Sequence, residues 1–494
     1  MTRALPSAGD RILVGTEMVV VDSAFAASLE EGDSVLGIAA TGAVRRIPAG
    51  VDRLVDEGLA RATTAFSQMR SIPDAMVTDF YARAADLMSD DAVFEGIARA
   101  NQEDVDSALA RGRSTTRLVL DSRMRSDMVA AFGMWRDSAV GASERISVHE
   151  HDGWSVEEWR APLGPIGFVF EGRPNVFADA TGVLRTGNVV VFRIGSDALR
   201  TARAIMDRVI VRALAESGLP TGAVVLLDSM EHAAGWRLFS DRRLALAVAR
   251  GSGEAVAELG SIAQQSGVPA SLHGTGGAWI IAGSAADADR LSRVVEHSLD
   301  RKVCNTLNVL CVVESRAAEL LPVVHAAAER AAARRGVHAR IHADATASTH
   351  IPSVGLIDVV RPGGTTREPQ VTPTAPNALG HEFEWDQTPE FHVVCVRSVP
   401  EAVDLFNEHS PQFVVSVVSE DASEQETVWN GANAPFVGDG FTRWVDGQFA
   451  LLKPELGLSN WQNGRLFGRG GVLSGDSAHT IRLRVRQVDP DLHR

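Results

Sequence analysis

The chain has 494 residues, of which 45% are hydrophobic and 22% are charged, as in ordinary soluble globular proteins. Its formal net charge of −15 argues against a general affinity for nucleic acid, and no apolar run approaches the ~20 residues that cross a membrane. Three cysteines give neither a disulfide framework nor a metal-binding spacing, and no signal-peptide pattern opens the chain. We therefore expect a cytoplasmic protein of two or three domains that holds no metal ion.

The first part of the chain changes from a strand pattern to a helix pattern. Residues 1–50 contain short apolar runs separated by Gly, Asp and Ser, which predicts a small β-rich extension. From Val51 to about Trp135, apolar residues recur at intervals of three and four, the spacing of one helix face. Residues 146–160 alternate in polarity and predict a β-hairpin.

From Leu163 onward, apolar runs alternate with helical segments, which predicts parallel sheets covered on both faces. The first runs are residues 166–170, 188–192, 223–227 and 244–248, and a helix is expected over 196–217. A second α/β region follows over residues 271–418. Residues 362–376, rich in Pro, Gly and Thr, predict a loop, and residues 479–488 alternate like an edge strand.

Cys304 is the candidate nucleophile. Arg301 and Lys302 precede it, and a nearby cation stabilises thiolate over thiol, which lowers the pKa of the thiol. The alternative is a buried cysteine that packs as a small hydrophobic residue. Cys311 and Cys395, which lie inside apolar runs, fit that alternative better than Cys304 does.

Three turns follow predicted strands and open helices, at residues 171–175, 193–197 and 250–254. The carboxyl ends of parallel strands meet at one edge of a sheet, where α/β folds build ligand sites. A Gly-Ser pair that opens a helix favours a phosphate group. Each turn alone could equally be a helix cap, and none contains the G-x-G-x-x-G pattern of a standard Rossmann site.

In combination and in order, several motifs resemble those of the γ-glutamyl phosphate reductases (glutamate-5-semialdehyde dehydrogenases), a branch of the aldehyde dehydrogenase superfamily. They are residues 100–108, 162–175, 187–193, 249–252, 303–306 and 441–447. The resemblance covers about residues 51–490 and leaves the first 50 residues without a counterpart. It implies an aldehyde-dehydrogenase-like α/β fold with two doubly wound domains, a β oligomerisation element and the β-rich N-terminal extension.

The resemblance also implies a division of the chain. Residues 51–270 would form the nicotinamide-cofactor-binding domain, including the oligomerisation hairpin at about 146–160. Residues 271–420 would form the catalytic domain that carries the cysteine. Residues 421–494 would return to the cofactor domain and end in the edge strand.

The implied mechanism is acyl reduction. The Cys304 thiolate would attack an activated acyl carbon and expel phosphate, an adenylate or a thiol. The Asn175 side-chain amide and the Cys304 backbone N–H would form the oxyanion hole. Hydride from NADPH or NADH would then convert the thioester to an aldehyde. Covalent catalysis of this kind divides a difficult reduction into two easier steps.

Cofactor contacts are implied at the level of motifs. Arg193, Gly195 and Ser196 would face the adenosine, Gly251 and Ser252 the pyrophosphate, and Glu384 the nicotinamide ribose. Arg193 could favour the 2′-phosphate of NADPH, or it could be an ordinary cation at a strand end.

One difference from oxidative aldehyde dehydrogenases favours reduction. Those enzymes carry Glu-Leu-Gly-Gly, whose Glu activates the hydrolytic water. The matching stretch here, His273-Gly274-Thr275-Gly276-Gly277, has Gly274 in place of that Glu. Without this base, hydrolysis of the thioester should be slow. We expect His273 itself to be structural.

The substrate region departs from the glutamyl pattern. The family's Gly-Thr-Gln-His-Ser-Asp-Ala-Ile corresponds to residues 410–417, where Phe413 and two valines replace the polar His-Ser-Asp. Trp461 is a further addition. With Arg173 and Asn305, these two residues are our predicted substrate contacts, and they favour an apolar or aryl acyl group. The alternatives are a genuine γ-glutamyl phosphate reductase, an oxidative aldehyde dehydrogenase or an inactive scaffold subunit.

Two kinds of protein partner are expected. An activating kinase or ligase could hand over a short-lived acyl donor, with residues 1–50 as a docking module, although a stabilising role for this extension is the simpler alternative. Residues 146–160 and 479–488 are expected to pair between subunits in a homodimer or tetramer.

Overall fold

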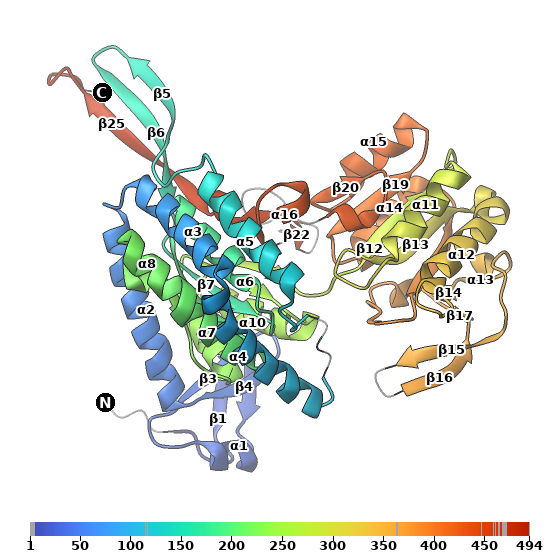
Figure 1. Cartoon of the computed structure of the whole chain (residues 1–494), viewed down its shortest axis with the longest axis horizontal. Helices are drawn as coiled ribbons and strands as arrows, with labels where there is room; N and C mark the ends of the chain where they lie inside the picture. Colours follow the sequence, from blue (N-terminus) through green and yellow to red (C-terminus); the bar gives the residue numbers. More distant parts are fainter. Residues whose placement is uncertain are drawn as a thin grey trace. The chain divides into compact units, whose positions relative to one another are not determined.

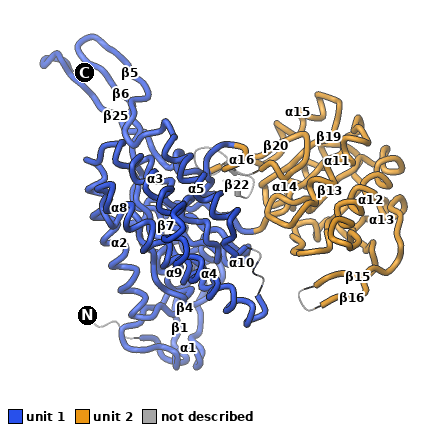
Figure 2. The backbone as a smooth tube through the Cα atoms, in the orientation of Figure 1, with its two compact units in different colours: residues 1–274, 451–457, 473–494 blue, residues 275–450, 458–472 orange. Residues whose placement is uncertain are grey.

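The computed structural model of the chain describes residues 5–113, 115, 117–361, 364–445, 447–457, 459, 461–462, 465–466 and 472–493. It divides into two compact units (Figure 2). The first unit comprises residues 1–274, 451–457 and 473–494, and the second comprises residues 275–450 and 458–472. The chain thus returns to the first unit at residue 451 rather than at 421, because β20 (Phe436–Gly438) pairs with β19 (Val414–Val418) in the second unit's sheet.

Two β-hairpins begin the first unit. β1 (Arg11–Val14) pairs with β2 (Glu17–Val20), and β3 (Ser34–Ile38) pairs with β4 (Ala43–Ile47), with the short α1 (Ser23–Ser28) between them. The second hairpin is fixed to the unit by Gln265, whose side chain bonds the backbone of Gly37 and Ala39.

Four helices follow: α2 (Ala49–Met69), α3 (Asp74–Ser89), α4 (Asp91–Ala110) and α5 (Ser122–Asp137). As the spacing of apolar residues predicts, α2 buries Val51, Val55 and Leu59 along one face. Aspartates start the later helices: the Asp90 carboxylate accepts from the N–H groups of Ala92 and Val93, and Asp121 caps α5 in the same way.

The first unit's sheet is parallel, with the order β11-β10-β7-β8-β9. Its strands are β7 (Pro165–Phe170), β8 (Val189–Ile194), β9 (Val224–Leu226), β10 (Leu246–Arg250) and β11 (Ala270–His273). The chain runs outward from β7 to β9 and then returns to the other side of β7. Open α/β sheets bind ligands at such a reversal, outside the carboxyl ends of the strands.

Helices cover both faces of this sheet. They are α6 (Val176–Thr181), α7 (Leu199–Ile205), α8 (Val211–Ser217), α9 (His232–Phe239) and α10 (Gly253–Gln265). Phe177 of α6 packs edge-on against Phe192, whereas Gly235 of α9 contacts Val169, whose side chain faces the other way. The single helix expected over 196–217 is interrupted by a 3-10 turn and by a π turn at Met206–Ile210.

An antiparallel arm of three strands projects from the first unit (Figure 1). β5 (Arg145–His151) and β6 (Trp154–Pro162) form the expected hairpin, and β25 (His479–Gln487) pairs along the whole length of β6. β5 and β25 are the two edges of this sheet. Two further strands of the unit, β21 (Glu455–Gly457) and β24 (Leu473–Ser474), pair with each other.

The second unit holds a parallel sheet with the order β17-β14-β18-β13-β12-β19-β20. The strands not yet given are β12 (Ala278–Ala282), β13 (Leu307–Val313), β14 (Arg340–Ala343), β17 (Val371–Pro373) and β18 (Glu390–Val396). Its helices are α11 (Ala288–Ser298), α12 (Ala317–Ala333), α13 (Ala345–Ser348), α14 (Val399–His409), α15 (Ala422–Gly431) and α16 (Gly447–Ala450). Trp461–Gln462 (β22) and Arg465–Leu466 (β23) form a short pair.

Alternate residues of β12 belong to two separate hydrophobic cores. Ile280 packs with the side chains of α11 and α12, whereas Trp279 and Ile281 pack with those of α14 and α15. The second sheet is therefore covered on both faces, as the doubly wound prediction requires. No helix within the described ranges is long and apolar enough to cross a membrane.

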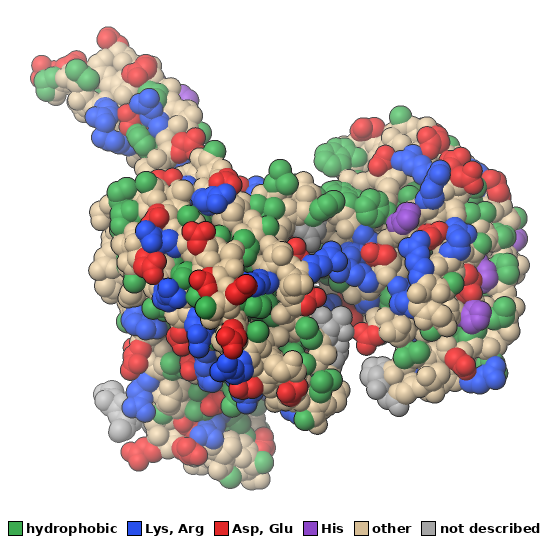
Figure 3. All heavy atoms as spheres, viewed as in Figure 1, with side chains coloured by type: hydrophobic (Ala, Val, Ile, Leu, Met, Phe, Trp, Pro, Cys, Tyr) green, Lys and Arg blue, Asp and Glu red, His purple; other side chains and the backbone are tan. Residues whose placement is uncertain are grey.

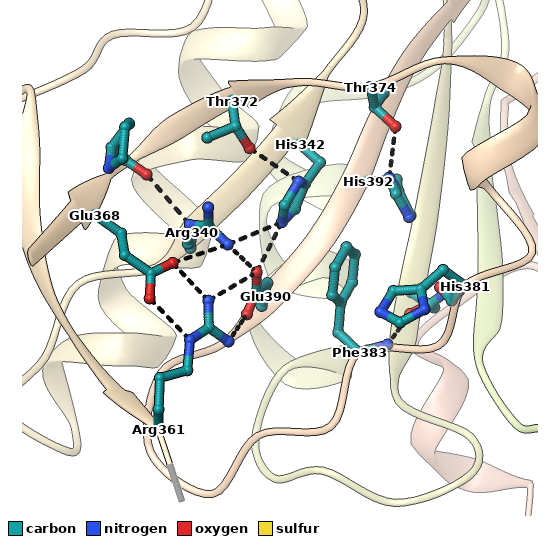
Figure 4. Close-up of polar contacts among 12 residues, drawn as sticks. Arg340, His342, Arg361, Glu368, Thr372, Thr374, His381, Phe383, Glu390 and His392 are labelled. Atoms are coloured by element: carbon teal, nitrogen blue, oxygen red, sulfur yellow. Dashed lines mark hydrogen bonds and ion pairs between the residues drawn. The ribbon is translucent and has the colours of Figure 1, made fainter. Parts of the chain in front are cut away.

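The prediction of a loop over residues 362–376 is wrong for most of that stretch. β15 (Leu356–Arg361) and β16 (Gly364–Pro369) form an antiparallel hairpin, and β17 follows at the edge of the sheet. Residues 362 and 363 lie outside the described ranges. Partly buried ion pairs, which the composition did not reveal, hold the hairpin: Arg361 bonds Glu368 of the same hairpin and Glu390 of β18 (Figure 4).

Candidate active site

Cys304 lies in a tight turn just before β13 and is half-buried. Thr306 stabilises this turn, because its hydroxyl accepts from the Val303 N–H at 2.9 Å and donates to the Arg301 carbonyl at 2.6 Å. The other two thiols are poor nucleophiles. Burial raises the pKa of Cys395 to about 12 and that of Cys311 further still.

A pair of glycines packs directly on the backbone of Cys304. The Gly277 N–H donates to the Cys304 carbonyl at 2.7 Å. A Cβ atom on Gly276 would lie 2.7 Å from Cys304 Cα and 2.8 Å from Cys304 O, which is closer than such atoms can approach. Glycine at 276 is therefore required by this contact.

Gly274 is also closely packed, within the first unit. A Cβ atom there would lie 2.9 Å from Gly253 Cα. The position aligned with the hydrolytic glutamate of oxidative enzymes thus has no space for a side chain without movement of the neighbouring backbone.

The cation beside Cys304 has a buried partner that the sequence did not reveal. Lys302 forms an ion pair with Glu382, and its Nζ atom lies 3.7 Å from Oε1 of Glu384. The Lys302 side chain is only 5% exposed, whereas that of Glu384 is 70% exposed. Glu382 also accepts a hydrogen bond from the Gly276 N–H, so one carboxylate joins two segments that flank Cys304.

Asn305 anchors the Cys304 loop. Its amide donates to the Val445 carbonyl and accepts from Arg443, and its own carbonyl accepts from the Thr442 hydroxyl at 2.7 Å. Arg443 also pairs with Asp300 at 2.7 Å. Residues 442, 443 and 445 of the motif at 441–447 thus hold the Cys304 loop in place. The same bonds use both the donor and the acceptor of the Asn305 side-chain amide within the protein.

A cluster of apolar and aromatic side chains packs against Cys304. The cluster is formed by Ala278, Phe413, Val414, Phe436 and Val445, together with Trp444 and Val472. The rings of Phe413 and Phe436 meet edge-on at 5.7 Å, and those of Phe436 and Trp444 at 5.8 Å. Phe413, a predicted substrate contact, is 1% exposed and lies within this cluster. Trp461 lies in β22, and its side chain is outside the described part of the chain.

The predicted residues of the first unit gather at the carboxyl edge of its sheet. The turns after β7 and β8 touch, since a Cβ atom on Gly195 would lie 2.6 Å from the Gly172 nitrogen. Ser196 follows that contact. Gly251 and Ser252 follow the neighbouring β10 and open α10, and the Ser252 side chain makes no cap hydrogen bond. Glu384 belongs to the second unit.

Asn175 occupies the N-cap position of α6 but does not cap it. Its side chain makes no cap hydrogen bond, although asparagine is a strong capping residue. Its Oδ1 atom is buried and meets no hydrogen-bond partner in the part of the chain that the structure describes. The Oδ1 acceptor of Asn175 is therefore not used among the described residues.

Arg193 is buried at the end of β8 and donates to the Met230 carbonyl at 3.1 Å. Its Nε finds no hydrogen-bond partner among the described residues. Burial lowers the pKa of this guanidinium, which nevertheless stays charged near neutrality. A buried cation with an unused donor and an uncapped helix N-terminus are features that suit a phosphate-bearing cofactor.

Burial and three arginines shift the pKa values of Glu171 and His273. Although burial opposes it, Arg173, Arg117 and Arg250 hold the pKa of Glu171 below its usual value. Burial and the same three arginines lower the pKa of His273 to about 3. His273 is thus uncharged at neutral pH. Arg173 pairs with Glu171 at 2.7 Å.

A cysteine in a loop held by glycines, and strand-end turns suited to a dinucleotide, define a class of nucleotide-dependent enzyme. A model of the aldehyde dehydrogenase family matches residues 39–349, and the chain belongs to this family. It is accordingly an NAD(P)-dependent oxidoreductase of the aldehyde dehydrogenase type.

Several named relatives are similar to the chain over most of its length. A gamma-glutamyl phosphate reductase of Rhodopseudomonas palustris is 29% identical over 390 residues, which cover 76% of this chain and 81% of the relative. One from Rhodopirellula baltica is 28% identical over 421 residues, covering 81% and 87%. The crystal structure of gamma-glutamyl phosphate reductase from Thermotoga maritima has a TM-score of 0.75 at 23% identity, covering 89% of this chain and 100% of that one. The predicted family and fold are confirmed.

Proposed function

We propose that the protein reduces an activated carboxylic acid to an aldehyde through a thioester on Cys304. The observation that carries the direction of the reaction is the packing of Gly274 against Gly253. It leaves no space for a carboxylate that would activate water, so the thioester would persist long enough to be reduced.

The protein's own groups account for the acyl-transfer steps. The Cys304 thiolate forms a C–S bond with the acyl carbon, and the leaving group departs with the electrons of its bond to that carbon. The Asn175 side-chain amide and the Cys304 backbone N–H would stabilise the oxyanion. Bound NADPH or NADH would supply the hydride. Collapse of the resulting thiohemiacetal breaks the C–S bond and regenerates the thiolate.

We propose that the cofactor lies at the carboxyl edge of the first sheet. The N-terminus of α10, with Gly251 and Ser252, would hold the pyrophosphate, while Gly195 and Ser196 would lie near the adenosine. Arg193 would favour the 2′-phosphate of NADPH over the hydroxyl of NADH, because its guanidinium is buried and keeps an unused donor. Glu384 remains the proposed contact of the nicotinamide ribose.

Two substrate classes are proposed. The names of the relatives favour γ-glutamyl phosphate, which would make this a γ-glutamyl phosphate reductase. The aromatic cluster packed against Cys304 favours a more apolar or aryl acyl group, in which case Phe413 would back the acyl pocket and Trp461 would add to it. Arg173 completes the proposed contacts, whereas Asn305, whose amide bonds Val445 and Arg443, would hold the loop rather than touch the substrate.

Oxidation of NAD(P)H distinguishes these substrates. The protein would be supplied with enzymatically generated γ-glutamyl phosphate, with an aryl acyl phosphate, and with the corresponding thioesters. Faster turnover of γ-glutamyl phosphate than of the aryl donor would refute the apolar assignment. Turnover that survives Cys304→Ala would refute the covalent mechanism itself.

The arm is proposed to join subunits. Its β25 edge exposes Leu483 and Val485 at 67% and 61%. Figure 3 shows hydrophobic side chains on the surface of the projecting arm. An open strand edge with apolar side chains is a template for pairing with a second chain. Light scattering should show that Leu483→Arg lowers the molar mass of a homodimer or tetramer. An activating kinase or ligase remains the other proposed partner, and deletion of residues 1–48 would test its docking.

A further inference from the structure

The ion pair between Lys302 and Glu382 connects the nucleophile's loop to a distant part of the second unit. Lys302 lies two residues before Cys304, and Glu382 lies 80 positions later in the chain. The two side chains are 5% and 13% exposed. Water therefore screens this pair poorly, and its charges act strongly on a neighbouring group.

The carboxylate lies close to the reacting residue. The point that a Gly276 Cβ atom would occupy is 2.7 Å from Cys304 Cα and 2.8 Å from Glu382 Oε1. Other charged groups also lie along the loop: Glu384 and Arg301 are exposed, and Arg443, whose side chain is 9% exposed, bonds Asn305 and is paired with Asp300 at 2.7 Å. Of these two ion pairs, the one between Lys302 and Glu382 is the less exposed.

We propose that Glu382 is a positioning residue that fixes the Cys304 loop through Gly276 and Lys302 and offsets the positive charge of Lys302 beside the thiol. The inference rests on the proposed role of Cys304 as the nucleophile. An unopposed lysine would make the thiolate more abundant but less nucleophilic, because nucleophilicity falls with the pKa of the thiol. The Glu382 carboxylate, by offsetting the lysine, keeps the thiolate both populated and nucleophilic.

The two charges should act on Cys304 in opposite directions. Glu382→Gln keeps an oxygen that can accept from the Gly276 N–H but removes the negative charge, so the thiolate becomes more abundant. Lys302→Met leaves the carboxylate unopposed, so the thiolate becomes rarer. We expect each change to alter the thiolate fraction about tenfold below the thiol pKa, and the alkylation rate about threefold after the opposing change in nucleophilicity.

The measurement is the rate of iodoacetamide labelling of Cys304, followed by mass spectrometry from pH 5 to pH 10 in the full-length protein. The labelling profile should move to lower pH in Glu382→Gln and to higher pH in Lys302→Met, with Lys302→Arg close to wild type. Glu384→Gln is the matched control, and its effect should be smaller because solvent screens that carboxylate.

Movement of both profiles in the same direction would show that the substitutions only loosen the loop and would overturn the proposal, as would unchanged profiles. The labelling needs no substrate, so its outcome is independent of turnover. If reduction persisted in Cys304→Ala, the proposed function would be rejected. The effect of Lys302 and Glu382 on the labelling of Cys304 could still be measured, because their variants retain the cysteine.

Discussion

Replacing Gly276 with alanine should nearly abolish reduction while the protein stays folded. The added methyl group would lie 2.7 Å from Cys304 Cα and 2.8 Å from Cys304 O, whereas unstrained carbon contacts lie at about 3.5–4.0 Å. Both neighbours are backbone atoms, and the Gly277 N–H holds that carbonyl at 2.7 Å. The Cys304 loop must therefore move by about 1 Å.

The size of the effect follows from this displacement. A shift of about 1 Å at a reacting group costs about 100-fold in rate, and inserting a methyl group into a packed site costs about 1–3 kcal/mol of stability. We expect kcat of NAD(P)H-dependent reduction to fall about 100-fold, with a lowered thermal midpoint but a cooperative transition.

Gly440→Ala is the matched control, because a Cβ atom at Gly440 would meet none of the described residues within 4 Å. That variant should keep the wild-type kcat and thermal midpoint. If Gly276→Ala also kept kcat within about threefold of wild type, the close approach to Cys304 would not constrain catalysis and the reasoning would fail.

Three further outcomes are expected. Asn175→Ala should lower kcat by about 100- to 1,000-fold with little change in KM, because an oxyanion donor acts in the transition state; an equal rise in KM would indicate substrate binding instead. Brief iodoacetamide treatment of the native protein at pH 8 should label Cys304 and spare Cys395, whose pKa burial raises to about 12; equal labelling would contradict the assignment of Cys304 as the reactive thiol. Although burial opposes it, hydrogen bonds from His342 and Arg361 lower the pKa of Glu390 to about 2. A depressed carboxyl pKa stabilises the fold above the unfolded value of about 4.3, so this contribution should be lost as the pH falls from about 4.3 toward 2. Thermal melts should show that Glu390→Gln is less stable at pH 7 but loses less stability on acidification than wild type; equal losses would refute the linkage.

The parts of the site that depend on local sequence could be predicted. Buried parallel strands are nearly continuous apolar runs, so β7, β8 and β10 could be recognised, and so could the turns that follow them. Cys304 was distinguishable because charged residues precede it, whereas Cys311 lies in an uninterrupted apolar run.

The parts that depend on contacts between distant segments could not be predicted. The cation Lys302 could be recognised, but nothing in the sequence near residue 302 indicates that Glu382 pairs with it. The bond from the Asn305 amide to the Val445 carbonyl spans 140 positions and is equally invisible. The hairpin of β15 and β16 is not evident from its Pro- and Gly-containing sequence, and the bond from Arg361 to Glu390 joins it to another strand that lies later in the chain.

The first unit is assembled from both ends of the chain, which has a consequence for the order of folding. Asn188, in the turn before β8, donates to the Ala478 carbonyl at 2.6 Å, and Thr186 donates to the Gly475 carbonyl at 2.9 Å. β6 also has no partner on one side until β25 is present. During synthesis the second unit therefore emerges from the ribosome and can fold while the first still waits for its last strand. A nascent chain of this protein carries an unpaired strand edge on β6 until residues 479–487 are made.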